Sequence, residues 1–434
     1  MRSTFKAVNF IALVGLCALG ACQANEPPLV SATTLSNGGP VRLSPQLTPE
    51  QRLAHSRGAS FFHKPWVTAP STTSDRDGLG PLFNAHSCVS CHKGFGRGDL
   101  PALSTRESSG LLFRLYNSDT FGAQLQTRAT VGLAAEAQVD ILRNKVALQR
   151  EFADGTLVQL IAPAYTLTTT VKNLSLSPRL APPLFGVGLL NAIPDETLRD
   201  FADPDDNNGD GISGQYSDVG GRPGRFGWKA EQNSLRSQVA KAFHEDIGIS
   251  SSVFPVDNSL PCGSEPCTIL ALRSAKTGTT DISDEGLAAV VDYLSVLTLP
   301  LRPQDNDRRE NIKQGWRLFK QAACISCHRV GVKTAKSSNP LLSEQVIHPF
   351  SDLLLHDMGE ALADRSSHKR AKEWRTAPLW GLGTAAGPYL HDGRATTLLE
   401  AILWHDGEAA ASINRVLRFN SKERAALLEF LAAL

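Results

Sequence analysis

Two short stretches, "SCVSCHKG" at residues 87–94 and "ACISCHRV" at residues 323–330, contain the same pattern, Cys-x-x-Cys-His. This spacing is typical of c-type haem attachment, because two thiols on one turn can form thioethers with the haem vinyl groups while the adjacent histidine reaches the iron. A structural zinc site would need a second pair of ligands close by, and a thioredoxin-like redox pair needs no histidine after it. The sequence therefore predicts two covalently attached haems, held by Cys88, Cys91 and His92 and by Cys324, Cys327 and His328.

The sequence around the two motifs repeats as well. In "GPLFNAHSCVSCH" and "WRLFKQAACISCH", Phe83 and Phe319 each lie five residues before the first cysteine, a spacing that suits a short helix with an aromatic side chain near the porphyrin edge. Further on, "AAVVDYLSVL" at 288–297 aligns without gaps with "AALLEFLAAL" at 425–434. Both segments have the periodicity of amphipathic helices. Each motif is therefore followed by the same closing helix.

Helix-start signals precede both closing helices, at Ser283 with Asp284 and at Ser421 with Glu423. The pattern predicts a mainly α fold of two tandem cytochrome c-like domains, over 46–299 and 300–434. The boundary falls at "TLPLRPQDND", where prolines and charged residues interrupt the pattern.

The two domains are unequal in length. From Cys324 to the end there are 111 residues, whereas Cys88 to Leu297 spans 210, so the first domain must contain a large insertion. Short runs of β-branched and aromatic residues between Gly110 and about Lys172 predict some β-strands in this insertion.

The first 22 residues have the features of an export signal, with a charged start, an apolar run and small residues before a cysteine. The segment is too short to span a membrane. Its end, Leu19-Gly20-Ala21-Cys22, resembles the lipobox of bacterial lipoproteins, in which the cysteine is lipidated; an ordinary cleaved signal is the alternative. Gln23 resembles the residue that permits transfer to the outer membrane. We therefore expect a lipid-anchored protein on the periplasmic side of a bacterial membrane, the outer one, with 23–45 as a flexible tether.

The charge balance excludes one class of partner. Forty-four Lys plus Arg against 43 Asp plus Glu give a formal charge of +1, and no block of like charge stands out. We therefore expect no nucleic-acid partner.

An acidic stretch, "DPDDNNGDGISG" at 203–214, resembles the beginning of a calcium loop of EF-hand type. Asp206, Asn208 and Asp210 would offer oxygen ligands at alternate positions, and Gly211 permits the sharp turn. Position twelve is Ser217 rather than glutamate, so an acidic turn without metal is the alternative.

A second pair of cysteines, Cys262 and Cys267, lies in "PCGSEPC". In an exported protein we expect these two to form a disulfide that closes a surface loop, with a thiol-redox pair as the alternative.

Met358 is the only methionine besides Met1. It follows His328 by 30 residues in the hydrophobic segment "LLLHDMGEAL", and histidine with methionine is the usual ligand pair of a high-potential c-type haem. Core packing is the alternative, but a chain that fills its core without methionine has little need of one as filler. We predict that Met358 is an axial ligand of the second haem, so the first haem must differ.

Several longer stretches resemble a known family. They include "SPRLAPPLFGVGLLNAIP", "GRFGWKAEQNSLRSQVAKAF", "DLLLHDMGEALAD" and "RTAPLWGLGTAAGPYLHDGRATTLLEAILWHDGEA". Together with the stretches around 87 and 203, they resemble the dihaem c-type oxidoreductases often labelled thiol oxidoreductases, within the bacterial dihaem cytochrome c peroxidase superfamily. The resemblance runs from about residue 45 to the end.

The resemblance implies a division of labour between the haems. The second haem, with His328 and Met358, would relay an electron, and the first, with His92, would be the site where peroxide binds. A glutamine and a glutamate beyond the first motif would move the proton, and Gln124 and Glu136 resemble that pair. Trp228 or Trp380 could lie between the haems, although a buried tryptophan is more often a core residue.

The sequence thus predicts an exported dihaem enzyme that reduces peroxide or another small oxidant with electrons from a periplasmic carrier protein. Two alternatives stay open. The protein could be a dihaem electron carrier without substrate chemistry, or it could oxidise an external substrate such as a thiol or a protein side chain, or act in a redox step of metal uptake.

Overall fold

The computed structural model describes residues 35–36, 47–73, 75–100, 110–116, 121–169, 174–256, 280–300, 306–364, 370–384 and 387–434. Cys22 and the pair Cys262 and Cys267 lie outside these residues. The helices are α2 (Pro49–His63), α3 (Val187–Asn191), α4 (Asp195–Phe201), α5 (Leu235–Ala242), α7 (Asp284–Ser295), α8 (Arg309–Gln321), α9 (Leu398–Leu403), α10 (Ala410–Val416) and α11 (Ser421–Ala433). Within the described ranges, no helix is long and apolar enough to cross a membrane.

The strands form two-stranded pairs rather than one large sheet. They are β1 (Leu35–Ser36), β2 (Leu82–Phe83), β3 (Leu111–Tyr116), β4 (Arg128–Ala129), β5 (Gln138–Glu151), β6 (Leu157–Thr168), β7 (Ser175–Leu180), β8 (Asp218–Val219), β9 (Arg222–Pro223), β10 (Leu299–Pro300), β11 (Val332–Lys333), β12 (Val346–Ile347), β13 (Leu355–Asp357) and β14 (Glu373–Arg375). With 33% helix and 20% strand the fold is mixed, so the prediction of a mainly α fold is wrong. The repeated helices were recognisable by their period, but most strands are only two or three residues long and leave no pattern in the sequence.

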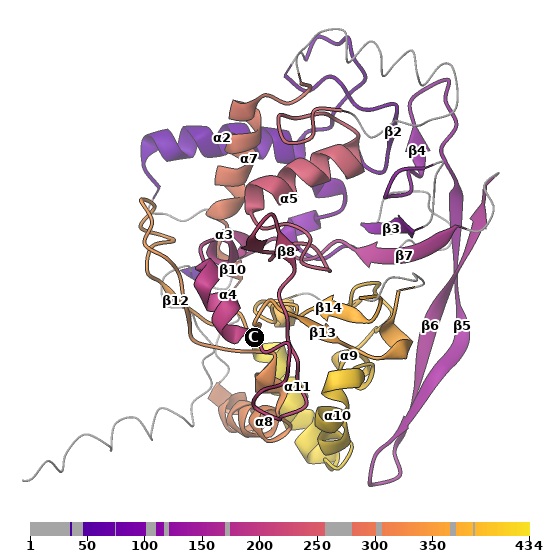
Figure 1. Cartoon of the computed structure of the whole chain (residues 1–434), viewed down its shortest axis with the longest axis vertical. Helices are drawn as coiled ribbons and strands as arrows, with labels where there is room; N and C mark the ends of the chain where they lie inside the picture. The colour runs from indigo at the N-terminus through magenta and orange to yellow at the C-terminus, as the bar shows by residue number, and fades with distance from the viewer. Residues whose placement is uncertain are drawn as a thin grey trace, which may run out of the picture.

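Two helix pairs repeat the same contact, α2 with α7 and α8 with α11 (Figure 1). At the first crossing, a Cβ on Gly58 would collide with the carbonyl oxygen of Ala289 and the side chain of Tyr293. At the second crossing, a Cβ on Gly315 would collide with the carbonyl oxygen of Ala426 and the side chain of Phe430 in the same way. The gap-free alignment of the closing helices places the same residue pairs in register. The two halves therefore share one helix-packing geometry.

The structure changes the expected pairing of aromatic side chains before the motifs. Phe319 lies on α8, but Phe83 lies on strand β2 rather than on a helix. The residue in the position of Phe319 is Phe62 on α2, since each follows its crossing glycine by four residues. The alignment of the two Leu-Phe pairs fails because the first half has an extra 20 or so residues between its helix and its cysteines.

The insertion contains β3, β5 and β6, where the sequence predicts strands, and its long hairpin crosses to the other half of the molecule. In Figure 1 the β5–β6 hairpin runs along one side toward the yellow helices α9 and α10. Phe152 at its tip and Leu160 are buried in the core of α8 and α11. The Ala153 N–H donates to the Leu417 carbonyl at 2.8 Å, and Arg424 forms an ion pair with Asp154 at 2.8 Å. The hairpin therefore fastens the second half to the first.

The caps of the closing helices are partly those expected. Ser283 caps α7 by accepting the Gly286 N–H. The cap of α11 is Asn420, which forms a capping box with Glu423, so Ser421 is the first helical residue and not the cap.

Gly315→Ala is expected to destabilise the protein. A methyl group at this crossing would force α8 away from α11, and overpacking of this kind costs about 1–3 kcal/mol, more than alanine gains in helix propensity. The measurement is the midpoint of denaturant unfolding of the haem-loaded protein. The control is Gly122→Ala, where a Cβ meets no atom within 4 Å. Equal midpoints for the two variants would contradict the tight crossing.

Candidate haem sites

Each Cys-x-x-Cys-His motif lines its own cavity. We call the cavity lined by Cys88, Cys91 and His92, of about 220 Å³, the first cavity. The second cavity, of about 200 Å³, is lined by Cys324, Cys327, His328 and Met358. Phe62 lines the first and Phe319 the second, which follows from the repeated helix pairs. The structure thus brings together the residues that the sequence predicts for each haem.

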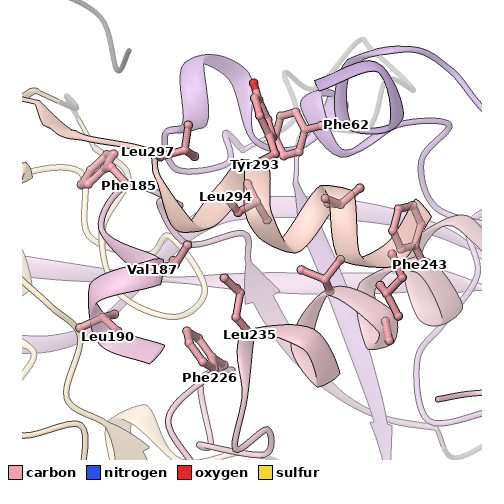
Figure 2. Close-up of a cluster of buried hydrophobic side chains, with 14 of the residues drawn as sticks. Phe62, Phe185, Val187, Leu190, Phe226, Leu235, Phe243, Tyr293, Leu294 and Leu297 are labelled. Atoms are coloured by element: carbon pink, nitrogen blue, oxygen red, sulfur yellow. The ribbon is translucent and has the colours of Figure 1, made fainter. Parts of the chain in front are cut away.

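The walls of the first cavity are mostly apolar. Figure 2 shows many of their side chains packed around α7, and they come from helices and loops that the chain separates by more than 200 residues. The labelled residues that line this cavity are Phe62, Phe185, Val187, Leu190, Phe226, Leu235 and Leu294. A flat apolar macrocycle is suited to such walls.

The cysteines start one turn of 3₁₀ helix in each half, η1 (Cys88–Ser90) and η5 (Cys324–Ser326). The turn places the histidine beside them, since its N–H donates to the first cysteine's carbonyl at 3.0 Å in both motifs. Burial raises the pKa of the Cys88 and Cys324 thiols to about 12. Structural zinc needs thiolates, so these neutral thiols favour haem over zinc.

Both histidines are held in the form that binds iron. Burial lowers the pKa of His92 and of His328 to about 4, so each imidazole is neutral at ordinary pH. The His328 Nδ1 donates to the Phe350 carbonyl at 2.8 Å, which leaves Nε2 for a metal. Met358 follows β13, and its N–H donates to the Lys372 carbonyl at 3.0 Å.

A buried ionic network lies beside Met358, and the sequence gave no sign of it. His356 lies between two carboxylates, 2.9 Å from Asp352 and 2.7 Å from Glu408. Burial alone would lower its pKa, but hydrogen bonds to Asp352, Cys327 and Glu408 outweigh burial and raise it to about 12. Glu408 also accepts the N–H groups of Ser213 and Asp357, each at 3.1 Å. The network fixes β13 and hence the position of Met358.

The first cavity has a polar wall instead of a methionine. Gln124 lies on this wall, and its Nε2 donates to Asp246 at 2.7 Å. Burial raises the pKa of Asp246 to about 7. Beside them Arg114 forms an ion pair with Glu245 at 2.6 Å. Asp246 has no motif around it, so only the fold reveals its place next to Gln124.

Glu136 lies apart from this wall. Its carboxylate accepts the Gln126 N–H at 2.6 Å, and burial raises its pKa to about 7. The Gln126 side chain in turn donates to the carbonyls of Gln124 and Glu245. Glu136 therefore braces the segment that contains Gln124, while the described lining of the first cavity does not include it.

Of the two candidate tryptophans, Trp228 lines both cavities and Trp380 lines the first. The Trp228 indole N–H donates to the Leu180 carbonyl at 2.7 Å, which fixes its ring between the two sites.

A model of the family described as "Di-haem oxidoreductase, putative peroxidase" matches residues 35–114 and 128–434. The chain belongs to this di-haem oxidoreductase family. Membership confirms the predicted family, the haem cofactors and the oxidoreductase class. No curated protein sequence matches the chain. Among solved structures, a chain of Kuenenia stuttgartiensis hydrazine synthase pressurised with 20 bar xenon is similar, with 15% identity and a TM-score of 0.35. The match covers 94% of this chain and 100% of that chain, and it is too weak to support an argument.

In this di-haem oxidoreductase the acidic loop lies at the surface, next to the second cavity. Its side chains accept backbone N–H groups of the loop itself: Asp206 from Gly211, Asn208 from Asp210, and Asp210 from Ile212. Ser213 links the loop to Glu408. Calcium binding here stays a prediction.

Asp246→Asn is expected to change how stability depends on pH. A carboxyl whose pKa is raised from 3.8 to about 7 by folding contributes stability below pH 4 that is lost as pH rises through 7. The variant keeps an oxygen that can accept from Gln124 but cannot ionise. Its melting temperature relative to the wild type should therefore rise between pH 4 and pH 8. Asp140→Asn, at an exposed carboxylate, is the control, and parallel pH curves for all three proteins would contradict the burial of Asp246.

Proposed function

We propose that the protein is a dihaem c-type enzyme that reduces peroxide at the first haem with electrons relayed by the second. The observation that supports this best is the difference between the two cavities. The second pairs His328 with Met358 in apolar surroundings, which suits an iron with two fixed ligands and a high potential. The first offers His92, has no methionine available to it, and carries hydrogen-bonding groups on its wall.

The haem in the first cavity would supply the iron on which peroxide is reduced. The reaction takes up two electrons and two protons for each peroxide and releases two water molecules. Cys88 and Cys91 would hold the haem through thioethers, and His92 would bind the iron. Asp246 would move the proton between the peroxide oxygens, because its pKa near 7 lets it both give and accept one. Gln124 would orient Asp246 through their hydrogen bond.

The path of the second electron would cross the shared wall. Trp228 lines both cavities, so its ring is the side chain that contacts both haems when they are bound. His328 and Met358 would hold the relay iron, with Cys324 and Cys327 attached to its porphyrin.

The location and the electron donor are part of the same proposal. A lipid on Cys22 and the tether at 23–45 would keep the protein on the periplasmic side of the outer membrane, within reach of a periplasmic electron carrier. A small oxidant could diffuse to such a site without a docking partner.

The experiment that tests the function compares spectra of the oxidised and half-reduced protein before and after addition of peroxide. The proposal requires that one haem reacts with peroxide within the mixing time while the other is oxidised in step. An electron carrier without substrate chemistry would show two six-coordinate haems that do not change with peroxide in either state.

Met358→Ala is expected to lower the potential of one haem and to abolish absorption from sulfur bound to iron. Loss of a thioether ligand removes preferential stabilisation of the reduced iron. Redox titration followed by absorption measures both effects. Leu362→Ala, which also enlarges the second cavity but removes no sulfur, should keep the band. A band retained in Met358→Ala would return this residue to core packing.

Asp246→Asn and Gln124→Leu are expected to slow the reaction with peroxide, by roughly 10²–10⁴-fold for the proton-transferring group. The measurement is the rate of spectral change after rapid mixing of the half-reduced protein with peroxide. Glu136→Gln in the same assay tests the carboxylate that the sequence favours. A large loss in Glu136→Gln with little change in Asp246→Asn would exchange the roles of the two.

A further inference from the structure

Two arginines lie on the wall that the cavities share. Besides Trp228 and the small side chains of Ala377 and Pro378, this wall contains Arg97 and Arg375. Their charges therefore face both sites at once.

Neither arginine has an acidic partner among the described residues. The Arg97 Nη1 is buried and has no hydrogen-bond partner there. Arg375 is buried and donates only to neutral backbone carbonyls, of Gly227 at 2.8 Å and of Thr376 at 3.2 Å. Burial lowers the pKa of each guanidinium to about 10, so both stay charged at neutral pH.

A repeated sequence shows how unusual this is. Arg179 in "RLAP" holds the position that Arg375 holds in "RTAP", at the end of the paired strands β7 and β14. Arg179 forms an ion pair with Asp364 at 3.1 Å, as expected for a buried cation. Arg375 lacks such a partner. Leaving two buried cations uncompensated costs several kcal/mol each, so the wall requires anions that the described residues do not supply.

Haem supplies anions of the right kind. The thioethers use its vinyl groups and leave two propionate carboxylates on each macrocycle, and a guanidinium binds a carboxylate through two parallel hydrogen bonds. We propose that Arg97 and Arg375 form a shared clamp that binds one propionate from each haem. The clamp rests on the haem binding of the proposed function but not on peroxide as the substrate.

The clamp has an electrostatic consequence for both irons. A cation near an iron favours the reduced state, so loss of one shared cation lowers both potentials. A guanidinium also lowers the pKa of the carboxylate that it binds. Without the guanidinium a propionate would titrate at higher pH, and its negative charge would then lower the potential of its own haem as pH rises.

The experiment is a redox titration of the haem-loaded protein without peroxide, resolved for the two haems, at several pH values between 5 and 8. In Arg97→Gln we expect both potentials to fall and both to become more dependent on pH than in the wild type. Arg97→Lys keeps the charge and should retain most of the wild-type behaviour. Lys241→Gln removes a cation that lines the first cavity alone, so it should change the potential of one haem at most.

Three results would overturn the clamp. The first is a change confined to one haem in Arg97→Gln, or no new pH dependence. The second is loss of haem from both Arg97→Gln and Arg97→Lys, which would show that the side chain is needed for its shape. The third is a wild-type potential that follows the concentration of chloride or phosphate, which would mean that dissolved anions occupy the wall. A protein that fails to reduce peroxide leaves all these readings valid.

Discussion

The close crossing of two helix pairs is the constraint on which both sites depend. At Gly58 and at Gly315 the backbone of one helix touches the carbonyl oxygen of its partner, and a side chain of any size would hold the helices apart. One helical turn later Phe62 and Phe319 turn into the cavities. The distance between the helices thus sets the width of each cavity on the side of its aromatic wall. The same packing appears twice, so the difference between the sites must come from elsewhere.

That difference comes from the polar groups around each cavity. In the second half His356, Asp352 and Glu408 form a buried ionic network whose charges offset one another, and it holds the strand before Met358 in place. In the first half the polar groups face the cavity instead, with Gln124 donating to Asp246. A network that is satisfied within the protein favours rigidity, whereas a carboxyl with a pKa near 7 is free to exchange a proton. The two sites are built for different tasks on the same helices.

The sequence predicted what is local and repeated. The Cys-x-x-Cys-His motifs, the closing helices and the link between His328 and Met358 all lie within segments whose spacing follows from the chemistry of one ligand set. It could not predict contacts between segments far apart in the chain, such as Gln124 with Asp246 or Ser213 with Glu408. The mistaken match of Phe83 with Phe319 has the same origin. A spacing of five residues is the same on a strand and on a helix, and only the packing shows which aromatic faces the cavity.

The long hairpin explains how two similar halves can share a wall. Short loops join the halves near 300, but a single covalent link would allow them to move relative to each other. The β5–β6 hairpin extends from the first half and buries Phe152 and Leu160 in the core of the second, where Arg150 and Asp154 add ion pairs with Asp406 and Arg424. A second attachment, distant from the first, removes this freedom. Electron transfer across Trp228 needs a fixed distance, and a shared pair of arginines needs both cavities in register. The insertion that makes the first half longer is therefore the part that lets the two sites act as one.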